Sequence, residues 1–478
     1  MNALFAWLQR KMVWITMAII GLVITLITVI SVKILNPYKP AFYIFSGYLD
    51  QTSMKVVDQK YSLKEYGDIN EFDYALSNQK AMAGVTSDYL IINLINEGKL
   101  APVSKEMQAL NNIQSKTDYL SFFTDEAQSQ MQFYDQFISA KTQQELRKKY
   151  PEYLENNINY DFTFSDFVVP YFMNDQVYAF DTKKILGQTF AAGEKINPLG
   201  FSETNGIPLA NSMIEAVNKI VTSYNQKNGI KIQWVKNEIE NTILGTEFNG
   251  GTFSTQLTND NYKQLLDNFS QMVLQATGHK MSETGFNLFE TDSDVILNNL
   301  INPDSYINVA TLYNGDALDA YWGNDNFKSI TDGDRLRIIR SKNSIRILDA
   351  FVVSSDISTE NKQDLLKFFN EEVFAHTFST KAELDELYTA DSENFYKQKG
   401  MLRIFDYVNY TVSAKGVYEF LVENYFTLEE NEAGETPIDP VALNIFQISP
   451  TAKPIYPVSK ELSSNLTALF QQKLNAFS

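Results

Sequence analysis

The stretch 85–102 constrains the fold most, because it carries the signals of a strand, a polar turn and a helix in immediate succession. An apolar-leaning run ends at Thr86–Asp88, whose side chains can cap a helix that begins near Tyr89. Gly98 can close that helix, and Pro102 prevents its resumption. In an open α/β sheet such a turn can face a ligand, although helix capping alone also explains these polar residues.

The same alternation of strand and helix recurs along the chain. Strand patterns cover 41–49, 164–173, 306–313 and 345–353, and a capped amphipathic helix follows over 358–373. This alternation predicts an α/β fold. Pro170 places its strand at a sheet edge or at a crossing between lobes. Asp349 lies in the middle of the last strand, where a buried charge must meet a partner, water or a ligand.

Pro208 marks the expected start of another helix. Proline favours the first helical turn, and apolar residues at helical spacing follow it. These residues are Leu209, Met213, Ile214, Val217, Ile220 and Val221. We therefore expect an amphipathic helix that opens at Ile207–Pro208 and ends at Gly229.

Composition excludes several classes of function. A chain of 478 residues is long enough for two or three lobes, and its net charge of -18 argues against a nucleic-acid partner. Without cysteine, this sequence offers no disulfide, thiolate metal site, catalytic Cys or acylated Cys. His279 and His376 lie far apart, so we expect no metal site. The chain also carries no nucleotide-binding or hydrolase motif, and we expect a protein that is not an enzyme and needs no cofactor.

Residues 12–32 form an uncharged apolar stretch of the length that a bilayer core demands. A cleaved secretory signal would have a shorter apolar region and a small-residue cleavage site, and we favour an uncleaved anchor. The sequence thus predicts a short N-terminal segment at 1–11, a transmembrane signal anchor at 12–32 and a proline-stiffened linker at 33–40. This corresponds to a single-pass protein of the cell membrane.

Five segments, in order, resemble the spermidine/putrescine-binding proteins of polyamine ABC importers, a family of periplasmic solute-binding proteins. They span most of residues 41–420. The matching segments are 42–48 (FYIFSGY), 85–100, 168–172 (VVPYF), 312–317 (LYNGDA) and 347–352 (ILDAFV).

The resemblance implies an α/β, two-lobed periplasmic-binding-protein-like fold with a ligand cleft between the lobes, preceded here by one transmembrane helix. Lobe 1 would comprise 41–178 plus 350–412, and lobe 2 would comprise 179–349 plus 413–478. The stretch near 228–285 has no counterpart in the resemblance. The large domain would lie in the extracellular or periplasmic space.

The resemblance also implies which side chains bind the ligand. Asp349 would pair with an ammonium group, while aromatic rings would pack on the methylene chain of a polyamine. Glu203 and Tyr410 are looser matches, and a capping Glu or a packed Tyr explains them equally well. The predicted ligand-binding residues are Ser46, Tyr48, Ser87, Tyr89, Tyr313, Asp349, Tyr410 and Glu203.

Three departures from the family pattern bear on the ligand. Gly47 stands where the family often has an acid, and Phe45 and Ile347 stand where it has Trp. These changes are compatible with a weaker site, a smaller diamine or another ligand.

The implied partners are a polyamine or another small cationic solute, the permease subunits of an ABC importer and, through them, an ATPase subunit. Two other classes remain open. The scaffold could serve as a ligand-free interaction subunit at the cell surface, or a pair of carboxylates could make it a hydrolase.

Overall fold

The computed structural model describes residues 2–35, 39–154, 159–204, 206–224, 229–324, 326–428 and 436–476. Residues 36–38 of the predicted linker lie outside the described residues. Strands and helices alternate through the chain, so the predicted α/β class is confirmed.

One continuous sheet organises the molecule, and its strand order is β2-β1-β3-β12-β5-β10-β8-β9. The strands β1, β2 and β3 run parallel to one another, as do β8, β9 and β10. In sheet order, the strands are β2 (Ser62–Tyr66), β1 (Ala41–Phe45), β3 (Ala81–Ser87), β12 (Ile345–Ser354), β5 (Val169–Asp181), β10 (Val309–Tyr313), β8 (Ile232–Val235) and β9 (Asn287–Glu290). The two parallel groups therefore form the two halves of the sheet.

Shorter strands extend this sheet at its sides. Both β4 and β14 pair with β12, while β11 and β13 pair with β5, and β7 links β11 to β6. Their bounds are β4 (Leu100–Ala101), β6 (Ser202–Thr204), β7 (Ile207–Ala210), β11 (Leu336–Ser341), β13 (Thr411–Val412) and β14 (Lys453–Pro454).

The long strand β5 joins the two halves. Its first part pairs with β12, from Val169 to Asp175, and its second part pairs with β10 from Gln176 to Phe180. Every residue of β5 is buried. Pro170, near its start, was predicted to mark an edge strand or a crossing between lobes. The strand does cross between the two halves of the sheet, but it lies in the middle of the sheet, between β12 and β10, and not at an edge.

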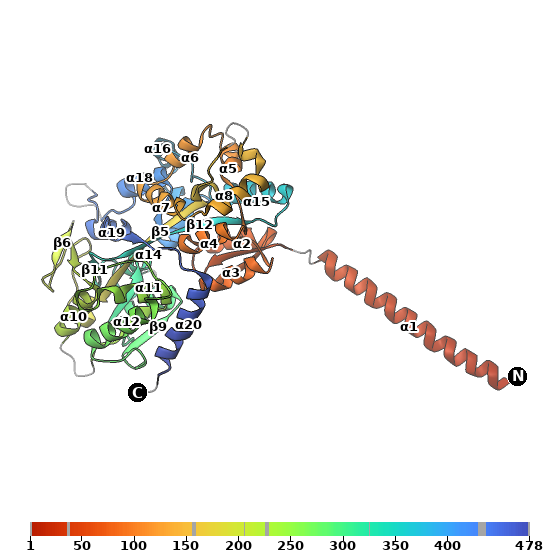
Figure 1. Ribbon diagram of the computed structural model, residues 1–478, viewed down its shortest axis with the longest axis horizontal. Coiled ribbons are helices and arrows are strands. Elements are labelled where there is room, and N and C mark those ends of the chain that lie inside the picture. Colours follow the sequence, from red (N-terminus) through yellow and green to blue (C-terminus); the bar gives the residue numbers. More distant parts are fainter. Residues whose placement is uncertain are drawn as a thin grey trace.

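Helices cover both faces of the sheet (Figure 1). Around the half that holds β1, β2 and β3 lie α2 (Gln51–Lys60), α3 (Ile69–Ser77), α4 (Asp88–Asn96), α5 (Ser104–Leu110), α6 (Lys116–Ser121), α7 (Asp125–Asp135), α8 (Ala140–Lys149), α15 (Thr359–Glu372), α16 (Lys381–Ala390) and α18 (Lys415–Asn424). The other helices are α9 (Thr182–Leu186), α10 (Met213–Ser223), α11 (Glu238–Leu244), α12 (Tyr262–Thr277), α13 (Ser293–Ile301), α14 (Asn314–Tyr321), α17 (Met401–Val408), α19 (Pro440–Phe446) and α20 (Lys460–Leu474). The short 3-10 helices are η1 (Pro151–Leu154), η2 (Phe164–Asp166), η3 (Gly245–Gly250) and η4 (Phe395–Lys397).

Two helix predictions have opposite outcomes. The strand and helix predicted at 85–102 are confirmed, since β3 ends at Ser87, α4 starts at Asp88 and Gly98 has a left-handed φ of 69°. The predicted side-chain cap was wrong for Ser87, whose hydroxyl makes no capping bond and donates to Asp349 instead. The prediction of a helix that opens at Pro208 was wrong about where the helix starts. Pro208 lies in β7, and α10 begins at Met213 after the cap residue Ser212.

The proposed division into lobes at 178/179, 349/350 and 412/413 stays a prediction. The residues just after 412 contact the β1–β3 half, because Thr124 donates its backbone N–H to the carbonyl of Ser413. Further along, α18 packs against α16.

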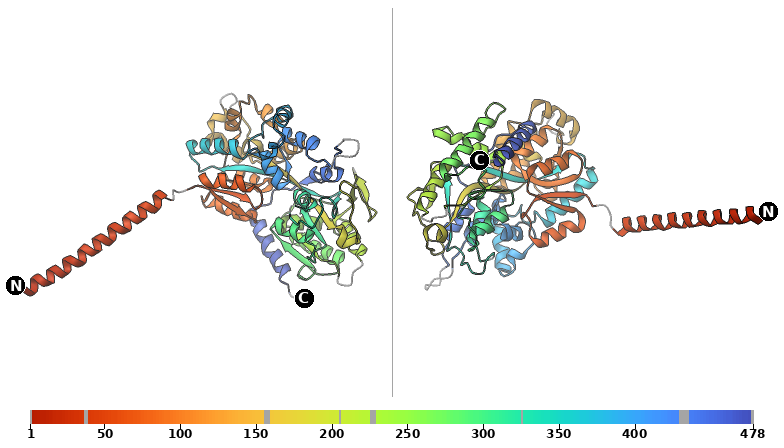
Figure 2. Two further views of the ribbon diagram at one scale, coloured as in Figure 1. Left: turned by 180° about the vertical axis from the view of Figure 1, so that it is seen from behind. Right: turned by 90° about the horizontal axis from the view of Figure 1, so that it is seen from below.

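The N-terminal helix α1 (Asn2–Leu35) lies apart from the folded body in Figures 1 and 2. Several of its large apolar side chains are exposed, with Trp14 71% accessible. Of the helices in the described part of the chain, none combines the length and the apolarity needed to cross a membrane. The transmembrane anchor at 12–32 thus stays a prediction.

Because β3 is closely packed at its centre, we expect one methyl group added at Gly84 to destabilise the fold. A Cβ added at Gly84 would lie 2.7 Å from the backbone oxygen of Tyr43 on β1. We expect Gly84→Ala to lower the free energy of unfolding by about 1–3 kcal/mol, measured by urea denaturation. Gly285 is the matched control, because an added Cβ there meets nothing within 4 Å. Equal stability of both variants would show that β1 and β3 pack less tightly than described.

Candidate functional site

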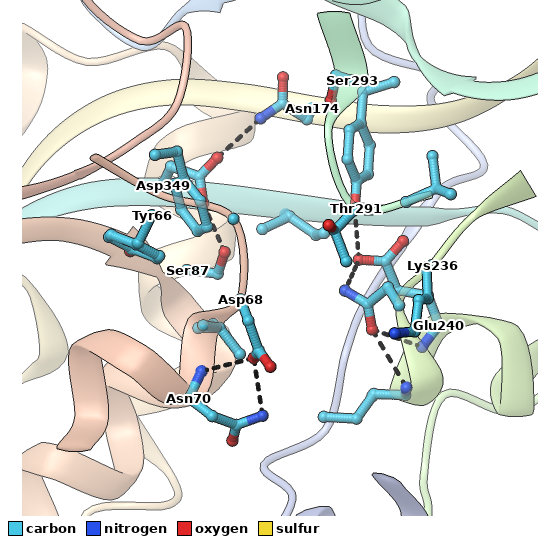
Figure 3. Close-up of a pocket in the computed structure, with 18 of the residues that line it drawn as sticks. Tyr66, Asp68, Asn70, Ser87, Asn174, Lys236, Glu240, Thr291, Ser293 and Asp349 are labelled. Atoms are coloured by element: carbon cyan, nitrogen blue, oxygen red, sulfur yellow. Dashed lines mark hydrogen bonds between the residues drawn. The ribbon is translucent and has the colours of Figure 1, made fainter. Parts of the chain in front are cut away.

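The strand ends converge on one cavity. The carboxyl ends of β1, β2 and β3 meet it from one half of the sheet, and those of β8, β9 and β10 meet it from the other. Its volume is about 310 Å³. Figure 3 shows side chains of both halves pointing into this space. Ligands of open α/β sheets bind at such carboxyl ends.

Asp349 is the buried acid of the first half. It is 2% exposed and lies on β12, directly opposite Ser87 of β3. Its Oδ1 accepts a hydrogen bond from the Ser87 hydroxyl at 2.6 Å, and its Oδ2 accepts from the Tyr48 hydroxyl at 2.6 Å and from Asn174 Nδ2 at 2.9 Å. Burial raises the pKa of Asp349 to about 6, although these three bonds oppose the shift.

The backbone beside Asp349 is held by a second buried acid. Asp88, the first residue of α4, accepts the backbone N–H of Leu348 at 2.9 Å, and also bonds with Gln130 and Tyr134. Burial raises the pKa of Asp88 to about 7. Asp88 therefore holds β12 in position behind the cavity. It is not among the residues that line the cavity.

Glu240, on α11, is the buried acid of the second half. It is 0% exposed, and its Oε1 accepts hydrogen bonds from the Tyr313 hydroxyl at 2.7 Å and from Asn237 Nδ2 at 2.6 Å. Asn237 Nδ2 also donates to the Tyr89 hydroxyl at 3.3 Å, which connects the two halves. Burial raises the pKa of Glu240 to about 8.

The two oxygens of Glu240 differ in their partners. Among the described residues, none donates a hydrogen bond to its buried Oε2. A buried carboxylate oxygen without a donor is costly, so a donor from a bound cation would stabilise this site.

Tyr410 completes the aromatic part of the lining. Its hydroxyl donates to Asp316 of α14, and its ring lies 4.9 Å from that of Tyr48, centroid to centroid. Burial raises the pKa of Asp316 to about 7. Gly315 allows this arrangement, because an added Cβ there would overlap the Tyr410 ring.

The charges around the cavity are unequal. The lining includes five carboxylates and one amine, that of Lys236, among the residues described. The five acids are Asp68, Glu238, Glu240, Asp292 and Asp349. A positively charged occupant would favour the ionised forms of these acids, including Glu240 and Asp349, whose pKa values burial raises. The described residues bring together no group of three acidic or histidine side chains that could hold a metal ion.

The structure gathers seven of the eight predicted residues around this cavity. They are Ser46, Tyr48, Ser87, Tyr89, Tyr313, Asp349 and Tyr410. Glu203 lies elsewhere, exposed on β6, where its Oε1 accepts a hydrogen bond from Asn197. The acidic side chain that the second half contributes is instead Glu240.

Sequence reasoning missed Glu240, Asn174 and Asn237. Glu240 and Asn237 lie within the stretch 228–285 that has no counterpart in the resemblance. The sequence did carry a signal for this second acid. The β-type run Ile232–Val235 is followed by Asn237, a residue type that favours the cap of a helix, and Asn237 caps α11 in the structure. Asn174 carried no signal, since a polar residue within a strand is uninformative before its pairing is known.

Several solved structures are similar to this chain. The Tp0655 (TpPotD) lipoprotein of Treponema pallidum is 9% identical and has a TM-score of 0.50, with 91% of this chain and 98% of that chain covered. A Listeria monocytogenes protein described as a spermidine/putrescine ABC transporter is 13% identical, with a TM-score of 0.49 and coverage of 91% and 98%. An ABC transporter solute-binding protein of Agrobacterium vitis with bound D-mannitol is 10% identical, with a TM-score of 0.45 and coverage of 91% and 92%.

The likeness to the Treponema protein shows that this chain has the two-part α/β fold of periplasmic binding proteins. The chain belongs to the family described as hypothetical lipoprotein (MG045 family), which matches residues 8–435. No curated protein is significantly similar to it.

The raised pKa values predict how the stability of the ligand-free protein depends on pH. The pKa values of Asp349, Asp88, Asp316 and Glu240 are about 6, 7, 7 and 8 in the folded chain, above the usual carboxyl range. The folded state therefore holds more protons than the unfolded state between about pH 4 and pH 8. The melting temperature should fall as the pH rises through this window.

Glu240→Gln tests the highest of these pKa values, because glutamine remains neutral at every pH. We expect the fall in melting temperature between pH 6 and pH 8 to be smaller in this variant, measured by scanning calorimetry. Glu386→Gln, at an exposed site on α16, is the matched control. An unchanged slope in Glu240→Gln would mean that Glu240 is not protonated in the folded chain.

Proposed function

We propose that this protein is the substrate-binding subunit of an ABC importer and that it captures small organic cations, in the first place spermidine and putrescine. The observation that carries the proposal is the pair of buried carboxylates, Asp349 and Glu240, which line one cavity from its two halves. A ligand with an ammonium group near each end would neutralise both.

The remaining lining suits such a ligand. Each ammonium donates several charge-assisted hydrogen bonds, and the buried Oε2 atom of Glu240 has no donor among the described groups. The methylene chain would pack against the rings of Tyr48, Tyr89 and Tyr313, which also attract cations. Because binding favours the charged carboxylates, affinity should decrease as the pH falls toward their pKa values.

Binding in this proposal proceeds by movement of the two halves. Strands β5 and β12 pass between them and would act as the hinge, and the ligand would become enclosed as the halves close. The closed form would then dock on permease subunits, which an ATPase subunit drives. This sequence contains no nucleotide-binding motif, so another chain would hydrolyse the ATP. The proposal assigns no catalytic step to this chain.

The N-terminal segment would hold the protein at the cell membrane as a single-pass anchor, with the large domain outside. The uncharged stretch 12–32 supports this role, and so does membership of a family described as lipoprotein. Cysteine does not occur among the 478 residues, so a thioether-linked lipid has no attachment point in this sequence. The peptide segment itself would provide the attachment.

A thermal-shift screen of the full chain in detergent tests the ligand class. We would use spermidine, putrescine, spermine, thiamine, sugars and amino acids. A ligand at a hundredfold excess over its dissociation constant adds about 2.7 kcal/mol of stability, which raises the melting temperature visibly. We expect a shift with the polyamines. A shift with another compound alone would replace the ligand but keep the transport class, and no shift at all would favour a ligand-free interaction subunit.

Asp349→Asn tests the site. The variant should keep nearly the same melting temperature without ligand. Its Kd for spermidine, measured by calorimetry, should rise by about 30-fold or more, since removing one partner of a buried charge pair costs about 2–5 kcal/mol. Glu203→Gln, an exposed acid outside the cavity, should bind as the wild type does. A large loss in Glu203→Gln with none in Asp349→Asn would place the ligand elsewhere.

Cell fractionation tests the anchor. We expect the full chain to stay in the membrane fraction after a high-salt wash, and a variant without residues 2–35 to be released. Mass spectrometry of the mature protein provides the control. Loss of the first residues from the mature chain would identify them as a cleaved signal and contradict the anchor.

A further inference from the structure

The C-terminal helix α20 forms part of the cavity wall. Ser463 and Thr467, four residues apart, lie on one face of this helix and line the same cavity as Asp349 and Glu240. Both are half-buried. The adjacent face, made by Leu462, Leu466 and Phe470, is buried in the core. The orientation of the two hydroxyl-bearing residues is therefore determined by packing.

Contacts with both halves hold α20 in place. At its start, Lys460 Nζ lies 2.6 Å from Asp73 Oδ2 on α3, and Asn93 of α4 donates to the carbonyl of Val458 at 2.7 Å. Along its length, α20 packs against α11 and α12. The Phe470 ring lies 5.5 Å from that of Phe289, and Lys473 pairs with Asp267. Figure 1 shows α20 beside α3 and β9, which belong to different halves.

Little space lies beyond this wall. A second cavity, lined by Ser463 together with residues of α3 and α4, has a volume of about 30 Å³. This second pocket is much smaller than the cavity that Asp349 and Glu240 line. A ligand that extends from Asp349 or Glu240 toward α20 would meet the face of the helix that carries Ser463 and Thr467.

We propose that Ser463 and Thr467 determine ligand specificity by limiting the length of the bound cation and by accepting a hydrogen bond from its terminal ammonium. This inference rests on the proposed function and deepens it. It assigns the limit on ligand length to α20, a helix that contains none of the site residues predicted from the sequence. Hydroxyl oxygens accept such bonds without adding further negative charge to an acidic cavity.

The test is calorimetry of the full chain with linear diamines from 1,3-diaminopropane to 1,8-diaminooctane, and with spermidine. Ser463→Leu adds bulk to the wall, and we expect it to weaken binding of the longest bound diamine by about tenfold or more. The shortest diamines should bind almost as before. Ser464→Leu introduces the same side chain at the next, exposed position of the helix and is the matched control.

Thr467→Val removes a hydroxyl at nearly constant volume. It should weaken all diamines that reach α20 without changing their order of affinity. The melting temperature of each variant without ligand shows whether it folds, and Thr467→Val provides a test even if Ser463→Leu fails to fold.

The outcomes separate the two proposals. A length profile that shortens in Ser463→Leu but not in Ser464→Leu supports the inference. Wild-type binding with the same profile in the folded variants overturns the role of α20 and leaves the proposed function intact. Failure of the wild type to bind any diamine overturns both.

Discussion

The buried carboxylate of Asp349 is the interaction on which the site depends. Its two oxygens accept hydrogen bonds from Ser87 of β3, from Asn174 of β5 and from Tyr48, which follows β1. A charge buried in this position would be prohibitively costly without such donors. The same donors orient the carboxylate and leave the acid at the edge of the cavity.

The two halves contribute similar chemistry by different routes. In the first half, a strand residue provides the acid, and the loop after β1 and the last residue of β3 provide its hydroxyl donors. In the second half, Glu240 comes from the first turn of α11, and Tyr313 at the end of β10 provides the hydroxyl. Because burial raises the pKa of both acids, an empty cavity favours protonation, whereas a cation would favour the ionised forms. Ligand and proton therefore compete for the same groups.

Local chemistry made part of this structure predictable. The polar residues that end β3 and the left-handed Gly98 marked the bounds of α4, although Ser87 uses its hydroxyl for Asp349 and not as a cap. An acid within an apolar strand identified Asp349 as a residue that needs partners. Pro208 misled because proline is compatible both with a first helical turn and with a strand such as β7, which pairs with β6 and β11. Glu203 was assigned by resemblance alone, and it lies on an exposed hairpin.

The sequence by itself determined the α/β class, the positions of several strand ends and the need of Asp349 for donors, because capping, periodicity and burial are local properties. Tertiary structure alone decided which acid faces Asp349, since Glu240 and Asp349 are far apart in the chain and meet only through the order of strands in the sheet. It also decided that α20 lies at the cavity, because the amphipathic pattern of a helix specifies a buried face but not the surface that buries it.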